Sequence, residues 1–516
     1  MSDRKLLDHA GLLTAATGVS RVLGFLRDWL IAVVYGTTPA AQAFVVAYRI
    51  PNLLRTLIGE GAANAAFVPV LSRLRAREGA AAWSALAQAM AGRLLIGFVI
   101  LCGLGVASAP LVVGLFAPGF KADPALFDLT VKLTRILFPF LGLVGIAAFG
   151  MGLLHSVRRF TAPALGPPLL NLSMMAGIFL WQPDAVGLSI GVLAGGLLQI
   201  AVQLPALTRA GVNLRPSLQG HPALREIGRL LFPRAAGSAV YQLSVLIDTI
   251  FASFAGWVGA GGVAALYFAN RFLQLPLGLF SVSFSQAALP ALSEQIALGD
   301  RAGARRTLGL TLRSTLFISV PSAVGLFLFA GPIVTTLLQH GAFSAEASAM
   351  TASAMRWYGI GLIGLAAGKV LTTGLYAAGE SWGPVRSAGW ALALNAALNL
   401  LLVRSMGLAG LALATSAAAV LNAYQLLRQI EKQLGPVEGI GWSWLLRLSA
   451  ASLGMAAAAV GIWSARAVPA GGLSGWGAVG WLFGAILGSV AVFFVVAGLL
   501  RIEEADHFRG WIFRRR

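Results

Sequence analysis

The sequence predicts an all-α polytopic membrane protein with about 14 transmembrane helices: two six-helix repeat halves around a central cavity, followed by two C-terminal helices. Three observations predict this fold. Of the 516 residues, 58% are hydrophobic and 11% charged, with a mean hydropathy of +0.80, whereas soluble domains carry roughly 25% charged residues. Apolar stretches of about 20 residues, enough to cross ~30 Å of hydrocarbon, recur along the whole chain. Basic residues gather in alternate loops between these stretches.

Each predicted span is a run of apolar residues bounded by a polar or Gly/Pro-containing loop. The first, second, seventh and eighth spans are the least uniformly apolar. No long soluble insertion separates any two spans, so the chemistry of this chain is expected within or beside the bilayer. The predicted spans lie near residues 10–35, 41–70, 84–116, 126–154, 162–181, 186–207, 230–256, 262–292, 310–338, 350–377, 384–403, 407–428, 441–465 and 474–500.

The basic loops indicate the orientation of the chain. Arginine and lysine fall in every second loop and in the C-terminal stretch RGWIFRRR, while the opposite loops contain little beyond Lys121, Arg404 and Arg466. Because basic loops remain on the cytoplasmic side, we expect both termini in the cytoplasm. This topology accounts for the net charge of +19, so we expect membrane lipids and no nucleic acid as partners.

An internal repeat divides the chain. The segment GLLHSVRRFTAPALGPPLLNLSM, which begins at 152, resembles GLYAAGESWGPVRSAGWALALNA, which begins at 374. Residues 65–79 resemble residues 287–300 at a similar offset. Parallel repeats are a transporter architecture with the substrate site between the halves. We therefore expect an N-terminal six-helix half at 1–220, a C-terminal six-helix half at 221–436, and the last two helices with a basic tail at 437–516.

Several charged residues lie inside predicted spans, where one charge costs roughly 2.5–3.5 kcal/mol on insertion scales. In the first span, Arg21, Gly24 and Asp28 share a helical face, Arg27 lies beside them, and Ser20 lowers the bulk of the helix. Surplus positive charge at membrane depth predicts an anionic ligand. Arginine favours phosphate or pyrophosphate because its guanidinium binds phosphate bidentately. The second and eighth spans add Arg49, Arg55, Glu60 and Arg271.

Individual charges can also be accounted for without a ligand. An arginine near a helix end extends to the headgroups, which is an alternative for Arg49. An arginine–carboxylate pair also holds helices together, and Arg27 with Asp28 or Glu60 fits that description. In both of these alternatives the charge is stabilised by the membrane surface or by the protein itself.

A second polar cluster offers only oxygen and amide groups: Asp248, Asn395, Asn399 and Thr415. Asn395 and Asn399 are one helical turn apart on one face. Oxygen ligands suit a hard cation, so Na⁺ is the single candidate cofactor. The alternative is that these side chains only form hydrogen bonds between helices.

The sequence contains none of the familiar catalytic motifs. We find no GxxxxGK[ST] phosphate loop and no HExxH pair, and the histidines are scattered, mostly at loop edges. The single cysteine, Cys102, lies in an apolar run. We therefore expect a transporter and not an enzyme.

Five stretches carry a resemblance to a known family: SRVLGFLRD (20–28), YRIPNLLRTLIGEGAANAAFVPVLS (48–72), PALGPPLLNLSM (163–174), DTIFASF (248–254) and FANRFLQLPLGLF (268–280). With them the chain resembles, over essentially its whole length, the MurJ (MviN) family of lipid II flippases. That family belongs to the multidrug/oligosaccharidyl-lipid/polysaccharide exporter superfamily. The first two stretches are the most specific.

The resemblance implies a flippase of the bacterial inner membrane. It would move lipid II, an undecaprenyl-pyrophosphate-linked peptidoglycan precursor, to the periplasmic leaflet by alternating access, for cell-wall synthesis and cell shape. Cell-wall synthesis proteins are then candidate partners. By motif, the pyrophosphate-binding arginines correspond to Arg21, Arg27, Arg55 and Arg271. The hinge and gating residues correspond to Ser20, Gly24 and Glu60, and a sodium site found in some members corresponds to Asp248, Asn395, Asn399 and Thr415.

Three positions depart from the family pattern. Gln42 and Asn270 stand where the family often has aspartate, and Asn399 replaces a residue that is often acidic in sodium-binding members. The first two changes make the cavity more cationic, and the third weakens the sodium prediction. The alternatives are a flippase for another pyrophosphate-linked oligosaccharide lipid, such as an O-antigen lipid, and a drug/cation antiporter of the same superfamily. An antiporter of cationic drugs favours acids in its cavity, whereas arginines dominate here.

Overall fold

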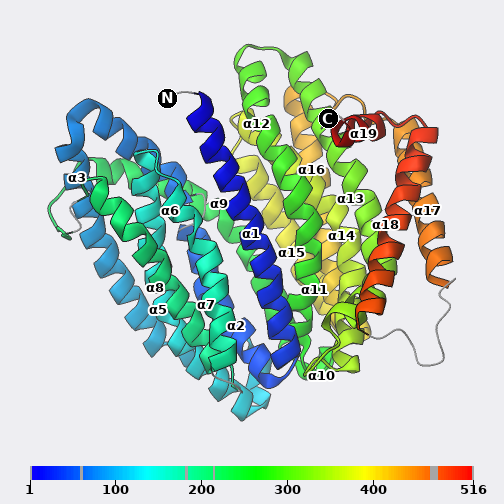
Figure 1. Cartoon of the computed structure of the whole chain (residues 1–516), viewed down its shortest axis with the longest axis horizontal. Helices are drawn as coiled ribbons and strands as arrows, with labels where there is room; N and C mark the ends of the chain where they lie inside the picture. The colour runs from blue at the N-terminus through cyan, green and yellow to red at the C-terminus, as the bar shows by residue number, and fades with distance from the viewer. Residues whose placement is uncertain (1–2, 59–61, 181–183, 213–214, 465–474, 514–516) are drawn as a thin grey trace. The chain divides into compact units, whose positions relative to one another are not determined.

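The computed structural model describes residues 3–58, 62–180, 184–212, 215–464 and 475–513, and their regular structure is helical (Figure 1). The chain divides into two compact units. Unit 1 comprises residues 1–254 and 341–343, and unit 2 comprises residues 255–340 and 344–516. An all-helical structure suits a membrane, because a helix pairs its own backbone polar groups where no water can do so.

Unit 1 is organised around one central helix, which packs most extensively against three others. This helix, α5 (Pro124–Ser156), is capped at its N-terminus by Asp123, whose side chain accepts a hydrogen bond from the backbone N–H of Leu126. Its main neighbours are α2, α3 and α8. The other helices of unit 1 are α1 (Asp3–Tyr35), α2 (Pro39–Ile58), α3 (Ala62–Ala107), α4 (Ala109–Phe116), α6 (Thr161–Ala164), α7 (Gly166–Leu180), α8 (Val186–Arg209) and α9 (Ala223–Ala252), with the short turn η1 (Pro118–Ala122).

Glycines bring α7 and α8 into close contact, and the two ribbons lie side by side in Figure 1. A Cβ on Gly177 would lie 2.3 Å from the carbonyl oxygen of Gly187, and one on Gly191 would lie 2.5 Å from that of Ser173. Small residues drive helix association in membranes because they let backbones approach closely. The contact fixes α7, which in turn packs against α1.

The long helix α3 changes direction at Gly79. This residue has a φ of 87° and a ψ of −175°, which lies outside the helical region and favours glycine because a Cβ makes positive φ costly. The change of direction separates the ends of two predicted spans, at 70 and 84. Gly79 therefore ends one membrane crossing and permits the next.

Unit 2 centres on α14 (Ala345–Ala377), which packs against α13 (Arg301–Leu338), α16 (Leu408–Leu434) and α11 (Gly262–Pro276). After Pro276 the chain forms a π-helical turn, η2 (Leu277–Ser281). Proline has no backbone N–H and so interrupts the helical ladder. The remaining helices of unit 2 are α10 (Ala255–Val258), α12 (Val282–Ala297), α15 (Trp382–Met406), α17 (Trp442–Ser464), α18 (Trp476–Leu499) and α19 (Glu503–Phe513).

The predicted class of an all-α polytopic membrane protein is confirmed, and the arrangement of two halves around a central cavity stays a prediction. Within the described residues, helices cover every predicted span, and eleven of them are long and apolar enough to cross a membrane. The predicted span 41–70 falls on two helices, α2 and the start of α3. The helix α9 packs against α2 and α3 within unit 1. The predicted division at 220/221 rests on the internal sequence repeat. The two compact units are defined by packing, which does not test a sequence repeat, so this division stays a prediction.

The C-terminal stretch contains a helix that composition did not predict, α19, and a buried ion pair holds it to α13. Glu504 is 1% exposed, and its Oε1 lies 2.6 Å from Nε of Arg313. The indole Nε1 of Trp444, on α17, donates to Oε2 of Glu504 at 3.1 Å. Phe508 stacks on Phe317 of α13, with ring centroids 5.8 Å apart. Since α17 and α18 also pack on α13, these contacts unite the C-terminal helices with the rest of unit 2.

We expect the Glu504→Ala variant to lose about 3 kcal/mol of unfolding free energy, because the partly buried Arg313 loses its buried partner and keeps only the exposed Glu503. Thermal unfolding of the purified protein in detergent measures the loss. Glu503 supplies a matched control, since its side chain is 71% exposed and it contacts the same Arg313. An exposed pair contributes under about 1 kcal/mol. Equal losses in the Glu503→Ala and Glu504→Ala variants would contradict the assigned burial effect.

Candidate functional site

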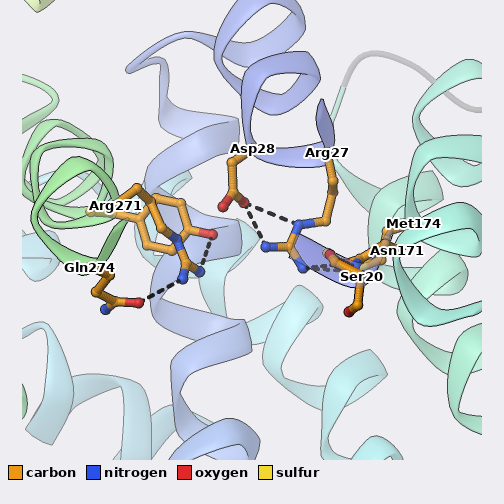
Figure 2. A network of polar contacts seen from close by, with 8 residues as sticks. Ser20, Arg27, Asp28, Asn171, Met174, Arg271 and Gln274 are labelled. Carbon is orange, nitrogen blue, oxygen red and sulfur yellow. Dashed lines mark hydrogen bonds and ion pairs between the residues drawn. The ribbon is translucent and has the colours of Figure 1, made fainter. Parts of the chain in front are cut away.

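The buried arginine of α1 is the best-defined predicted site residue. Arg27 is 9% exposed and Asp28 is 8% exposed. Nη2 and Nε of Arg27 donate to Oδ1 of Asp28 at 2.8 Å and 3.1 Å. Nη1 donates to Oδ1 of Asn171, on α7, at 2.8 Å. Figure 2 shows the guanidinium of Arg27 between these two partners, which together fix its plane.

Asn171 is the residue that the sequence-based site set missed. Its Oδ1 accepts from Arg27, and its Nδ2 donates to the backbone oxygen of Ser20 at 3.1 Å. The signal was available, because an asparagine in the apolar run 162–181 is costly unless it has partners. Nothing in the sequence says that the partners are on α1, 144 positions away.

The predicted hinge residues lie along this same contact. A Cβ on Gly24 would lie 3.7 Å from Nδ2 of Asn171, which is ordinary van der Waals contact. Ser20, Gly24 and Arg27 thus all meet Asn171, whereas the side chain of Arg21 is exposed. α1 is a continuous helix in this structure, and the hinge stays a prediction. The side chain of Arg55 and the whole of Glu60 lie outside the described residues.

Arg49 is anchored within unit 1. Its Nη1 donates to Oγ1 of Thr249, on α9, and Thr249 in turn donates to the backbone oxygen of Val245 at 2.7 Å. Thr249 follows Asp248, which is buried. Arg49 therefore has a protein partner at this position, in contrast to the alternative in which it only extends to the headgroups.

Unit 2 holds the other described arginine of the predicted set, on α11. Nη2 of Arg271 donates to Oη of Tyr267 at 2.7 Å, and its Cζ lies 4.5 Å from the Tyr267 ring centroid. Gln274 lies one helical turn further along, and its Oε1 accepts from Nη1 of Arg271 at 3.5 Å (Figure 2). Its Nε2 donates to Oδ1 of Asn270 at 2.6 Å. A cation on an aromatic face is favoured electrostatically, so Tyr267 orients the guanidinium.

Three of the four predicted cation ligands meet in unit 2. Asn395 and Asn399 of α15 are fully buried. Nδ2 of Asn395 donates to Oγ1 of Thr415, on α16, at 3.1 Å, and Nδ2 of Asn399 donates to Oδ1 of Asn395 at 3.3 Å. Asp248 belongs to unit 1. These hydrogen bonds match the helix-bonding alternative, and the cation site stays a prediction.

The chemistry of these groups is that of charge recognition. A guanidinium held in a fixed plane presents directed donors to phosphate oxygens, and it stays protonated when water is removed. Arg27 and Arg271 are each oriented by partners on their own unit, Arg27 by Asp28 and Asn171 and Arg271 by Tyr267. Such pre-oriented donors bind an anion with little loss of side-chain entropy.

Comparison with known proteins gives a consistent result. The family model described as "Lipid II flippase MurJ" matches residues 31–474. The chain is similar to the lipid II flippase MurJ of Burkholderia cenocepacia, with 35% identity over 440 residues that cover 83% of this chain and 84% of the relative. It is 33% identical to a probable lipid II flippase MurJ of Rhizobium tropici over 519 residues, which cover 97% of this chain and 95% of the relative.

Solved structures agree with the sequence comparison. A structure of the lipid II flippase MurJ in an inward closed conformation matches with a TM-score of 0.78 and 25% identity, and the match covers 95% of this chain and 98% of that one. An inward-facing multidrug resistance MATE family transporter of the MOP superfamily matches with a TM-score of 0.69 and 14% identity. That match covers 82% of this chain and 98% of the transporter, and at this identity it speaks for the fold alone.

Proposed function

The chain belongs to the family of the lipid II flippase MurJ, and we propose that it moves lipid II from the cytoplasmic to the periplasmic leaflet of a bacterial inner membrane for cell-wall synthesis. Relatives named as lipid II flippases over most of its length support this function. The structural observation that carries it is the buried guanidinium of Arg27, held in one plane by Asp28 and Asn171. Such a group at membrane depth suits the pyrophosphate of lipid II.

Alternating access is the proposed mechanism. The pyrophosphate pairs with Arg21, Arg27, Arg55 and Arg271 on the cytoplasmic side, and the polyprenyl tail remains in lipid. Binding of the anion relieves repulsion among the arginines and so favours the state that opens to the periplasm. No covalent bond of the substrate changes in this cycle, so the protein acts as a transporter and not as an enzyme. The return step is driven by the membrane potential, which contributes ~2.3 kcal/mol per charge per 100 mV, or by a cation gradient.

The basic loops support the proposed topology, in which both termini lie in the cytoplasm. The proposal keeps the division into halves at 1–220 and 221–436 with an appended segment at 437–516. Cell-wall synthesis proteins on either face of the membrane are the proposed protein partners.

The function is tested by depleting the chain in cells and asking which leaflet holds lipid II. A periplasmic enzyme that cleaves only exposed headgroups reports the outer pool. We expect cleavage to fall as lipid II accumulates on the cytoplasmic side, and re-expression of the chain to restore it. Unchanged cleavage in cells without another flippase would contradict the proposal. If re-expression of the chain instead restored the transport of a different pyrophosphate-linked lipid, the O-antigen alternative would be favoured. If it restored the efflux of drugs, the antiporter alternative would be favoured.

We further propose that Na⁺ binds at Asp248, Asn395, Asn399 and Thr415 and biases the return step. The buried amide pair of Asn395 and Asn399, bonded to Thr415, supports this proposal, because amide and hydroxyl oxygens are hard-cation ligands. A bound ligand stabilises by RT ln(1 + [L]/Kd), about 2.7 kcal/mol at 100 times Kd.

We expect Na⁺ to raise the melting temperature of the purified protein above its value in K⁺ at equal ionic strength. The Asn395→Ala variant should lose this difference, because it removes one ligand oxygen. Ser405→Ala, an exposed change on the same helix, is the control that keeps it. A Na⁺–K⁺ difference that survives in Asn395→Ala would refute the site, whatever the variant does to overall stability.

A further inference from the structure

A row of amide side chains runs along one face of α16 and has no role in the site described above. The row consists of Asn422, Gln425 and Gln429, with steps of three and then four residues. At 100° per residue they fall within about 60° of the helix circumference, and Thr415 falls on the same face. The face therefore continues from Thr415, in the Asn395–Asn399–Thr415 cluster, toward the end of α16 that carries Arg428 and Lys432.

The acceptor atoms of this row are buried without donors. Oδ1 of Asn422 and Oε1 of Gln425 and of Gln429 are buried and have no hydrogen-bond partner among the described residues. Buried amide oxygens are normally paired, and inside the predicted span 407–428, which contains Asn422 and Gln425, a partner does not come from bulk water. Three such oxygens on one helical face can accept together from a shared positive or protic ligand.

Two neighbouring helices form the walls beside this row. Nε2 of Gln429 donates to Oγ of Ser387, on α15, at 2.7 Å. Its Oε1 is directed at Gly383, where a Cβ would lie only 2.3 Å away. On α14, a Cβ at Gly368 would lie 3.8 Å from Nδ2 of Asn422. Glycine at 383 leaves room for the oxygen, so the row lies where α16 meets α14 and α15.

The length of the row suits a path across much of the bilayer. Thr415 and Gln429 are 14 residues apart, which is about 21 Å at 1.5 Å per residue, against ~30 Å of hydrocarbon. Oxygen atoms repeated at helical spacing can replace the hydration shell of a hard monovalent cation step by step. Opposite this row the helix carries side chains typical of a lipid-facing surface, with Val420 47% and Tyr424 58% exposed.

We propose that the amide row of α16 lines a hydrated path along which a monovalent cation of the size of Na⁺ moves between the Asn395–Asn399–Thr415 cluster and the Arg428/Lys432 end of α16. The proposal deepens the cation coupling proposed above, on which it rests, and is independent of which lipid is flipped. The path gives the cation a route within unit 2. Passage of the cation along this route can therefore accompany the conformational change of the transport cycle.

Ag⁺, a thiol-reactive monovalent cation, tests the path. Cys102 is the only cysteine, so Cys102→Ala gives a background in which single cysteines are placed at 422 and 425. The matched controls are Val420→Cys and Tyr424→Cys, at similar depth on the opposite face. Membrane fragments open on both sides are treated with silver nitrate. The thiols that remain are then counted with a maleimide after denaturation.

We expect Ag⁺ to modify Asn422→Cys and Gln425→Cys at least tenfold faster than the two controls, and sodium nitrate to slow this reaction more than potassium nitrate does. Rates no higher than those of the controls would overturn the path. Fast reaction with no effect of Na⁺ would overturn its assignment to a Na⁺-sized cation. Because the assay measures thiol reaction and not flipping, failure of lipid II transport in cells and failure of the path give separate results.

Discussion

The Arg27→Ala variant is expected to lose at least about 100-fold in the rate of lipid II transport. One hydrogen bond to a charged group contributes roughly 1.5–3 kcal/mol, and 1.4 kcal/mol corresponds to a factor of ten. Two such bonds from the Arg27 guanidinium to the pyrophosphate account for the loss. The measurement is complementation of a depleted strain, together with the headgroup-cleavage assay. Arg73→Ala is a matched control, because Arg73 forms an exposed ion pair with Glu226 at 2.7 Å elsewhere in unit 1.

The variant must be separated from a simple structural defect, since Arg27 also neutralises the buried Asp28. Removal of one partner of a buried pair destabilises by about 3–5 kcal/mol. The double variant Arg27→Ala/Asp28→Asn removes both charges, so we expect it to recover much of the melting temperature and none of the transport. Arg27→Lys keeps the charge but not the planar fork, and should also transport poorly. Wild-type transport by the double variant would show that Arg27 only holds α1 to α7.

The second large effect is expected for Arg271→Ala, in unit 2. We expect a loss of transport at least tenfold, because the variant removes one charge-assisted contact to the pyrophosphate. Arg271 contacts Tyr267 and also Gln274 (the latter labelled in Figure 2), and both of these are neutral side chains. Neither of these two partners is left as an uncompensated charge when the guanidinium is removed. Transport in the depleted strain and the melting temperature are measured on the same variant.

Arg404→Ala is the matched control for Arg271, because Arg404 is also in unit 2 and its Cζ lies 5.6 Å from the ring centroid of Trp257. It should retain transport within about twofold, as an exposed cation–π contact contributes only ~0.5–1 kcal/mol. Tyr267→Phe should reduce transport a few-fold, since it removes the hydroxyl that orients Arg271 but keeps the ring. If Arg271→Ala transports as well as Arg404→Ala, Arg271 does not bind the substrate.

The class of the fold followed from hydropathy because the bilayer leaves few alternatives. Apolar runs of sufficient length must form helices, and helices cover the predicted spans wherever the chain is described. At Gly79 the backbone of α3 leaves the helical conformation and changes direction between two predicted spans. The C-terminal helix α19 was not predicted, since its acidic first turn gives a weak hydropathy signal.

The charged residues inside apolar spans were recognised from sequence because each is costly there without a partner or ligand. Arg27, Asp28 and Arg271 were therefore candidates from the sequence alone. Their partners were not, because contacts between helices distant in sequence depend on how the helices pack. Asn171 contacts Arg27 because the glycines of α7 and α8 set the position of α7. Nothing in the sequence distinguishes Tyr267 from other aromatic residues, and its role follows from its contact with Arg271.

Sequence by itself thus determined the membrane-spanning helical class, the repeat and the unusual charges, since these depend on composition and local periodicity. Tertiary structure alone decided which charges are paired, that Glu504 is buried against Arg313, and that the amide oxygens of Asn422, Gln425 and Gln429 line up without donors among the described residues. The physical reason is that hydropathy acts on each segment separately, whereas hydrogen bonds and ion pairs require two groups within about 3 Å. Only the packing of helices brings such groups together.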